Sequence, residues 1–203
     1  AYWDRTERGG FLLKPFVSPS EAIRDIYVNG QFYAFECATA IIIILYKAVL
    51  ETGGNAVFDR FFDRLYLYSW THDTDLKLVT TYGTGEAFPG DVQYFKNPDV
   101  MPDALQWQGE NAVVMPGGRF FGHGIGVTRA WTIIAKLNQK RRPFSMRSAY
   151  LLDEATHPNF ELLEATLSQR AQPEAGLARL APPPLGVPYR VVARIGAREF
   201  RYG

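Results

Sequence analysis

The chain has 203 residues, and its 47% hydrophobic content fits one globular domain with a sizeable core. Lysine and arginine number 22 against 21 acidic residues, and a net charge of +1 argues against a protein that grips nucleic acid. The single cysteine excludes an intrachain disulfide and a zinc site built from several thiolates. The longest apolar stretch, 38–46, is well short of the roughly 20 residues that a membrane span needs.

A long apolar helix is the main predicted element. The sequence predicts it over about 35–51, ending at Gly53 and Gly54, where a left-handed cap is easy. Its apolar residues cover more than one face, so the helix must be surrounded on most sides. We therefore expect this helix at the centre of the fold.

Shorter elements are predicted around this helix. The patterns indicate helices over 20–27, 56–64, 128–139, 148–156 and 160–168, and strands over 65–70, 76–82, 92–95, 111–115 and 119–123. Ser20 is the predicted cap of the first helix. The glycines of 116–118 predict a hairpin that places Glu110 at the entry of one strand and His123 near the end of its partner.

Composition changes towards the C-terminus. Residues 171–188 mix alanine, proline and glycine, and this composition predicts an extended linker. Beyond it, 189–195 and 199–202 either pair as short strands or stay mobile. We therefore expect a catalytic domain over 1–167 and a Pro/Ala/Arg-rich tail over 168–203.

The one cysteine is a candidate nucleophile. Cys37 stands at the head of the apolar run, where the partial positive charge of a helix N-terminus favours a thiolate. Unpaired backbone N–H groups there could also bind the oxyanion that forms when the thiolate attacks a carbonyl. Taken alone, a lone cysteine is more often an inert core residue.

Several motifs around Cys37 resemble one known family. They lie at 20–26, 29–30, 32–40, 90–91, 94–98, 106–111, 120–124 and 148–152. The region that holds them is similar to the calcium-independent spore-coat transglutaminases (protein-glutamine gamma-glutamyltransferases) of endospore-forming bacteria. Members of that family usually have a longer N-terminal region, and this chain starts at Ala1, so we expect a trimmed fragment.

The resemblance implies a reaction and its setting. Cys37 would attack a glutamine γ-carboxamide, ammonia would leave, and a lysine ε-amine would resolve the thioester into an isopeptide bond. The implied substrates are glutamine- and lysine-bearing coat proteins, in the cytoplasm of the sporulating cell and in the spore coat. No cofactor is implied, and no residue spacing resembles a calcium or zinc site.

The order of elements also resembles the papain-like NlpC/P60 core. A helix that begins with Cys37 is followed by 89–91, which open a strand, and then by a hairpin. This resemblance implies an α+β fold in which the central buried helix packs on an antiparallel sheet. In that superfamily a catalytic histidine opens the strand at the place where Glu110 stands here. The resemblance therefore implies a Cys37–Glu110 pair.

The remaining site residues carry two interpretations each. Glu36 either satisfies the helix dipole or acts as an auxiliary proton acceptor, ranked below Glu110. His123 either polarises Glu110 or shares its proton, and it could equally end a strand. Trp70 and Trp107 are core residues or the walls of a narrow channel that keeps water from the thioester.

The pKa of a carboxylate must be raised before the group can act as a base towards a thiol. With ordinary pKa values of about 4.3 and 8.5, proton transfer from Cys37 to Glu110 is uphill. Burial of Glu110 beside Trp107 and Phe120 is expected to raise its pKa and narrow this gap. Two other functions stay open: an NlpC/P60-type cysteine peptidase or amidase on cell-wall peptides, and a structural coat protein whose Cys37 only packs.

Overall fold

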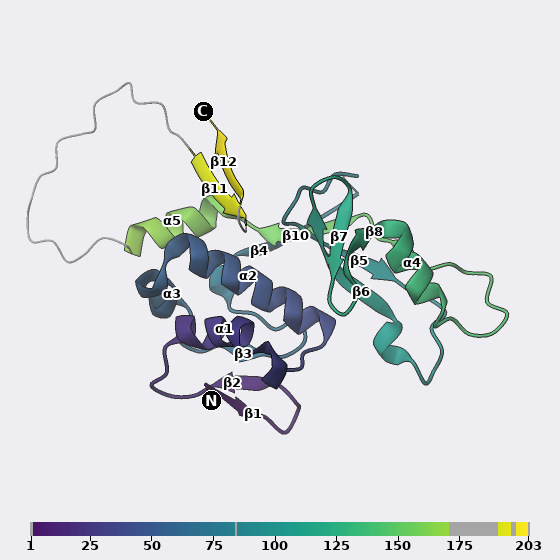
Figure 1. The fold of residues 1–203 in the computed structure, drawn as a ribbon, viewed down its shortest axis with the longest axis horizontal. Helices are drawn as coiled ribbons and strands as arrows, with labels where there is room; N and C mark the ends of the chain where they lie inside the picture. The colour runs from purple at the N-terminus through teal and green to yellow at the C-terminus, as the bar shows by residue number, and fades with distance from the viewer. Residues whose placement is uncertain (1, 84, 171–190, 196–197, 203) are drawn as a thin grey trace, which may run out of the picture. The chain divides into compact units, whose positions relative to one another are not determined.

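The computed structural model describes residues 2–83, 85–170, 191–195 and 198–202 (Figure 1). The chain divides into two compact units, the second beginning at Gln172. The first unit combines helices with antiparallel sheets, so the predicted α+β class is confirmed. The predicted boundary between 167 and 168 stays a prediction.

Helix α2 (Cys37–Gly53) is the predicted central helix. Ile41, Ile42, Tyr46 and Leu50 are all at most 1% exposed, because neighbouring elements cover this helix on several sides. The helix ends at Gly53 and is capped by Gly54, whose φ of 78° a glycine adopts without a Cβ clash. It begins two residues later than predicted, which makes the cysteine its first residue.

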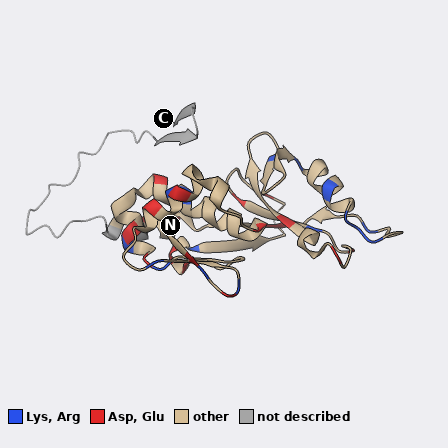
Figure 2. Ribbon diagram, turned by 60° about the horizontal axis from the view of Figure 1, so that its bottom comes forward, with Lys and Arg blue, Asp and Glu red and all other residues tan. Residues whose placement is uncertain are grey.

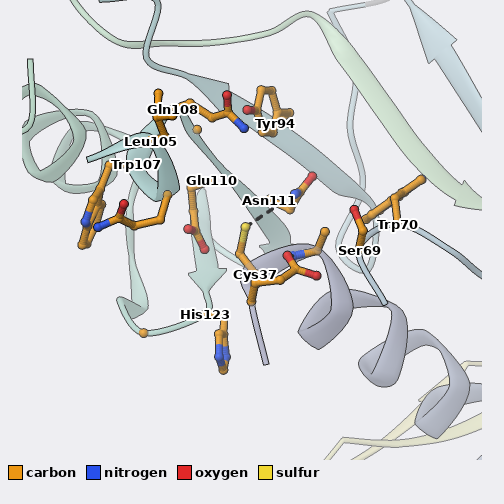
Figure 3. Close-up of a pocket in the computed structure, with 15 residues that line it drawn as sticks. Cys37, Ser69, Trp70, Tyr94, Leu105, Trp107, Gln108, Glu110, Asn111 and His123 are labelled. Atoms are coloured by element: carbon orange, nitrogen blue, oxygen red, sulfur yellow. Dashed lines mark hydrogen bonds between the residues drawn. The ribbon is translucent and has the colours of Figure 1, made fainter. Parts of the chain in front are cut away.

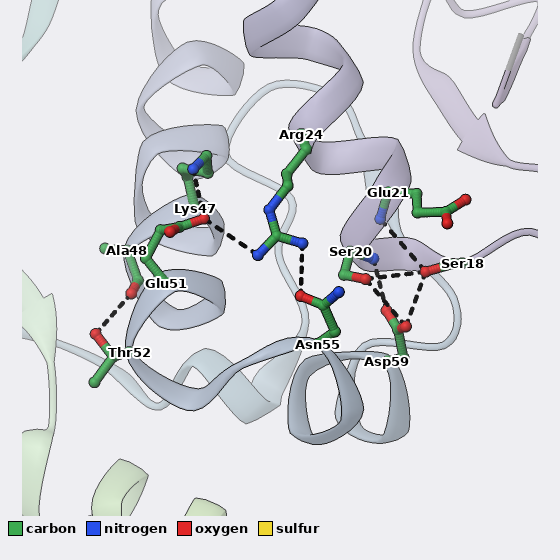
Figure 4. Close-up of polar contacts among 10 residues, drawn as sticks. All are labelled: Ser18, Ser20, Glu21, Arg24, Lys47, Ala48, Glu51, Thr52, Asn55 and Asp59. Carbon is green, nitrogen blue, oxygen red and sulfur yellow. Dashed lines mark hydrogen bonds and ion pairs between the residues drawn. The ribbon is translucent and has the colours of Figure 1, made fainter.

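Helices α1 (Pro19–Val28) and α3 (Asn55–Phe61) pack beside α2 (Figure 4). Asp59 accepts hydrogen bonds from the Ser18 hydroxyl at 2.8 Å and from the Ser20 backbone N–H at 2.6 Å. The predicted cap at Ser20 is wrong, because Pro19 suits the first helical position and Ser18 therefore caps the helix. Asp59 thus fixes the start of α1 on α3.

A small antiparallel sheet joins β1 (Trp3–Arg5), β2 (Phe11–Leu13) and β3 (Tyr66–Leu67). The predicted strand over 65–70 is reduced to β3. Ser69 has a φ of 51°, which takes the chain out of the extended conformation before Trp70. Trp70 therefore lies in a loop.

The larger sheet has seven strands, all antiparallel. They are β4 (Leu78–Tyr82), β5 (Val92–Lys96), β6 (Gly109–Met115), β7 (Arg119–Gly122), β8 (Gly126–Arg129), β9 (Tyr150–Leu151) and β10 (Glu154–Pro158). Their order is β4-β10-β5-β6-β7-β8, with β9 also pairing with β5. The hairpin of β6 and β7 confirms the predicted one.

The predicted helix over 148–156 is wrong. This segment forms β9 and most of β10, and β10 pairs with β4 on one side and with β5 on the other. Backbone pairing on both sides, together with burial of Ala155 to 2% exposure, outweighs the helix preference of its leucine, alanine and glutamate residues. Helices α4 (Ala130–Asn138) and α5 (Phe160–Arg170) confirm the two predicted on either side of it.

The larger sheet separates two hydrophobic clusters. Val113 of β6 packs in the cluster around α2, whereas its neighbours Ala112 and Val114 pack with Ile133 and Leu137 of α4. This alternation follows from the two-residue period of a strand. The prediction that the central helix packs on an antiparallel sheet is confirmed.

In the second unit, β11 (Val191–Ile195) and β12 (Arg198–Tyr202) form an antiparallel pair. The predicted linker over 171–188 lies outside the described residues. Acidic and basic residues are interspersed along the described part of the chain (Figure 2). None of the described helices is both long and apolar enough to cross a membrane.

Candidate active site

A cavity of about 650 Å³ opens at the N-terminal end of α2 (Figure 3). Its lining includes every site residue predicted from the sequence: Glu36, Cys37, Trp70, Trp107, Glu110 and His123. They come from the start of α2, the loop after β3, a 3₁₀ turn (Leu105–Trp107), strand β6 and the turn after β7. The fold therefore brings together residues that are up to 87 positions apart in the sequence (36 to 123).

Cys37 is the first residue of α2 and is half-buried. Burial raises the pKa of its thiol, and the negative charges of Glu110 and Glu36 raise it further. Hydrogen bonds from the backbone and side chain of Asn111 act in the opposite direction, and Asn111 Nδ2 lies 3.8 Å from Cys37 Sγ. Burial and the two carboxylates therefore favour the thiol over the thiolate.

Glu36 caps the helix that carries the thiol. Its carboxylate accepts hydrogen bonds from the backbone N–H groups of Ala38 at 2.7 Å and Thr39 at 2.8 Å, and also from the Thr39 hydroxyl. Of the two interpretations, this geometry is that of a capping residue. A proton taken from Cys37 would neutralise the carboxylate and so weaken these bonds.

Glu110 is a buried carboxyl that points towards the sulfur (Figure 3). Burial raises its pKa to about 7; the His123 backbone N–H lowers it and the charge of Glu36 raises it. Its Oε1 atom has no hydrogen-bond partner among the residues that the structure describes. A carboxyl with a pKa near 7 can both accept and donate a proton at neutral pH.

Gly122 of β7 provides the space for this carboxyl. A Cβ atom at position 122 would lie 3.1 Å from Glu110 Oε1, closer than most real contacts of this kind. Gly122 could not be identified as a site residue from the sequence, because only strand pairing places it beside Glu110. Any larger residue at this position would push on the carboxyl.

His123 meets the site through its backbone and not through its ring. The ring is exposed, and its Nε2 lies 3.1 Å from the Phe35 carbonyl oxygen. Since a carbonyl oxygen only accepts hydrogen bonds, Nε2 carries the hydrogen. The backbone N–H of His123 is the group that acts on Glu110.

Trp70 and Trp107 lie on opposite sides of Cys37 (Figure 3). Both rings are half-buried and both line the cavity, so neither is a fully enclosed core residue. The Lys140 ammonium lies 5.9 Å from the centre of the Trp107 ring. The thiol is thus flanked by aromatic surface on both sides.

Two further lining residues were missed by the sequence analysis as site residues, Asn111 and Tyr94. They pair across β6 and β5. Burial raises the pKa of Tyr94, and the negative charges that Cys37, Glu110 and Glu154 carry when ionised raise it further. Both lie in motifs noted above, but only the register of the two strands shows that they face the thiol.

The cavity offers no metal site that can be recognised from its side chains. Among the described residues, no group of three or more histidine, cysteine, aspartate or glutamate side chains is arranged to hold a metal ion. The groups available for chemistry are therefore the thiol, the carboxyls and the amide donors around them.

The fold and this site define a class: α+β proteins in which a thiol at the start of a buried helix faces a buried carboxyl on a strand of an antiparallel sheet. The chain belongs to the protein-glutamine gamma-glutamyltransferase family, whose sequence profile matches residues 1–167. The resemblance of the motifs to the protein-glutamine gamma-glutamyltransferases is confirmed.

Relatives and a solved structure agree with this assignment. The chain is 47% identical over 172 residues to a protein-glutamine gamma-glutamyltransferase of Bacillus mycoides and 48% identical over 162 residues to one of Bacillus cereus. It covers 60% and 58% of those proteins, while the matches cover 85% and 80% of this chain. It is also similar to a transglutaminase from Geobacillus stearothermophilus without its C-terminal extension, with 53% identity and a TM-score of 0.76 over 85% of this chain and 80% of that one.

Proposed function

We propose that this protein is a protein-glutamine gamma-glutamyltransferase that cross-links proteins through a thioester on Cys37. The observation that carries the proposal is the buried Glu110 carboxyl, with a pKa of about 7, pointing towards the only thiol of the chain. Membership of the family supports the same reaction. The two other functions have no comparable support in the comparisons.

In the first half of the proposed reaction, the ionised Glu110 takes the thiol proton as Cys37 Sγ attacks the carbon of a glutamine γ-carboxamide. A bond forms between sulfur and carbon. The bond between carbon and nitrogen then breaks, and the proton held by Glu110 leaves with the nitrogen as ammonia. Because the pKa of Cys37 is raised, proton removal and attack belong to one step without a stable thiolate.

In the second half, a lysine amine attacks the thioester carbon. Glu110 takes a proton from the attacking nitrogen and returns it to Cys37 Sγ as the carbon–sulfur bond breaks. The products are an isopeptide bond and the free thiol, so the enzyme is regenerated without any net change. Trp70 and Trp107 keep water away while the thioester waits for the amine.

Two groups are suited to hold the oxyanion of both steps. The first is the Cys37 backbone N–H, because Glu36 already occupies the N–H groups of Ala38 and Thr39. The second is the Asn111 side-chain amide, whose nitrogen already lies 3.8 Å from the sulfur. Both donors would lie close to the atom at which charge develops.

We extend the proposal to the setting of the reaction. The substrates are glutamine- and lysine-bearing coat proteins, the location is the sporulating-cell cytoplasm and the spore coat, and the reaction is independent of calcium. The Bacillus sources of the relatives support this setting. We also propose that the core is of the NlpC/P60 type, supported by the order of α2, the strand that follows Asp91, and the hairpin.

One experiment separates this function from its alternatives: ammonia release from a glutamine donor, measured with and without a primary amine. A transglutaminase releases ammonia and incorporates the amine. A cysteine peptidase or amidase leaves the amine unincorporated, and a structural protein releases no ammonia. Activity that is lost with a chelator and restored by one cation would contradict the calcium-independent part of the proposal.

A further inference from the structure

A second cavity of about 240 Å³ lies against the first. The two share three lining residues, Trp70, Tyr94 and Asn111. Asn111 is also the residue whose side-chain nitrogen lies 3.8 Å from Cys37 Sγ. Cys37 lines the first cavity, and the three shared residues form the wall between it and the second.

The second cavity suits a slender chain with a polar end. Trp70, Tyr82 and Tyr94 provide aromatic surface, and the hydroxyls of Thr80 and Thr156 bond to each other at 2.7 Å. Glu154 is the one carboxylate in the lining, and no lysine or arginine lines either cavity. An alkyl stem that ends in a cation fits this combination.

The carboxylate of Glu154 has room for a ligand. Glu154 is half-buried, and within the described part of the chain no lysine or arginine forms an ion pair with it. Glu154 and Tyr94 line the second cavity together, and the charge of Glu154 raises the pKa of Tyr94. The Gln93 side chain donates a hydrogen bond to the Glu154 backbone carbonyl at 3.3 Å, which helps to hold this part of β10 in place.

We propose that the second cavity is the entrance for the acyl acceptor, and that Glu154 recognises the ammonium group of a lysine or another primary alkylamine before it reaches the thioester. This inference rests on the proposed function. The larger cavity, which contains Glu110, then receives the glutamine donor. Donor and acceptor approach the sulfur from opposite sides, and neither has to leave before the other enters.

Glu154 acts before the bond-making step. The ammonium loses one proton to the solvent, because only the neutral amine has a lone pair for attack. The amine nitrogen then passes Tyr94 and Asn111 to reach the thioester carbon, where the carbon–nitrogen bond forms and the carbon–sulfur bond breaks. Glu154 therefore changes the concentration of amine that is needed, not the rate at saturating amine.

The test compares Glu154→Gln with the parent protein, using two acceptors of different charge. The first is a primary alkylamine, which is cationic at neutral pH, and the second is hydroxylamine, which is uncharged there. We expect the half-saturating alkylamine concentration to rise about fivefold, the size expected for loss of one partly screened charge pair. We expect the hydroxylamine value to stay unchanged. Adding salt should shrink the alkylamine difference, because salt screens the pair.

Asp153→Asn is the matched control. Asp153 is the neighbouring residue and carries the same charge, but it lines neither of these two cavities. It should leave both half-saturating concentrations unchanged. Glu154→Lys should raise the alkylamine value further than Glu154→Gln does.

Three results would overturn the inference. The first is a half-saturating alkylamine concentration that is unchanged in Glu154→Gln. The second is an equal rise in the half-saturating concentrations of both acceptors, which would mean that Glu154 acts through packing and not through its charge. The parent protein tests the proposed function separately, through ammonia release from a glutamine donor together with incorporation of hydroxylamine. If the parent does both, the proposed function stands whatever the effect of Glu154→Gln is. A parent that incorporates no amine overturns the proposed function and this inference together.

Discussion

Gly122 leaves the space that the Glu110 carboxyl occupies, since a Cβ atom at position 122 would lie only 3.1 Å from Glu110 Oε1. The two residues come from paired strands, so neither can move away without disturbing the sheet. The position of the proposed base thus depends on a residue that takes no part in the chemistry.

Gly122→Ala should therefore reduce turnover about ten- to a hundredfold, because a small displacement of a catalytic group is costly. Folding should be retained, since the Glu110 side chain can yield by a few tenths of an ångström. Steady-state ammonia release and a thermal melt would measure the two effects. Gly30→Ala is the control, as no atom lies within 4 Å of the added Cβ. Equal turnover in both variants would contradict this role of Gly122.

The raised pKa of Glu110 should also make stability depend on pH. Its pKa of about 7 in the folded protein lies above the value of 4.5 for an unburied carboxyl, so the folded state binds the proton more tightly. This contribution is fully present below pH 4.5 and is lost as the pH rises through 7.

Glutamine has no ionisable side chain, so the Glu110→Gln variant should not lose this stability as the pH rises. Compared with the parent, the variant should gain about 2 kcal/mol of unfolding free energy between pH 5 and pH 8. Denaturant titrations of both proteins at the two pH values would measure the difference. A parallel pH dependence in parent and variant would show that Glu110 is ionised without penalty in the folded protein.

Glu36 and Glu110 can be separated by their different contacts. Glu36→Ala removes a helix cap and should cost about 1 kcal/mol of stability, while Glu36→Ser keeps a capping oxygen and should restore most of it. If Glu36 is also a partial substitute base, Glu36→Ser should remove the activity that remains in a Glu110→Ala protein. Residual activity that survives in this double variant would limit Glu36 to capping.

Much of the fold could be predicted from the sequence because its signals are local. The apolar run of α2 and the glycines after it determine where that helix lies and ends, and the glycines of 116–118 determine the hairpin. The prediction of a helix over 148–156 was wrong for a physical reason. Its residues favour a helix, and only pairing with β4 and β5, which are distant in sequence, makes it a strand.

The site shows the same division. Cys37 and Glu110 could be predicted because they stand in recognisable motifs. The contacts of Asn111, Tyr94 and Gly122 could not, because the register of β5, β6 and β7 decides which way each side chain points. Glu154 could not be assigned to a cavity because its segment was predicted to be a helix. It lies beside Tyr94 only because β10 is a strand.

The tryptophans make a prediction about the fate of the thioester. If Trp70 and Trp107 exclude water, truncating either to alanine should increase the share of acyl-enzyme lost to hydrolysis more than it slows acylation. The ratio of amine incorporated to ammonia released should fall in each variant. Tyr68→Ala, a nearby aromatic residue that does not line the cavity, should leave the ratio unchanged. A constant ratio in both tryptophan variants would assign water exclusion to other residues.

In the proposed reaction, Cys37 carries the acyl group of a glutamine side chain. The most direct test is the intact mass of the protein, measured after rapid mixing with a glutamine-containing peptide and acid quenching. We predict an adduct on Cys37 equal to the peptide mass less one ammonia, which disappears when a primary amine is added before the quench. The opposite result would be a parent protein that releases ammonia from the peptide but forms no such adduct, together with a Cys37→Ala variant that remains active. That result would show that Cys37 does not carry the acyl group.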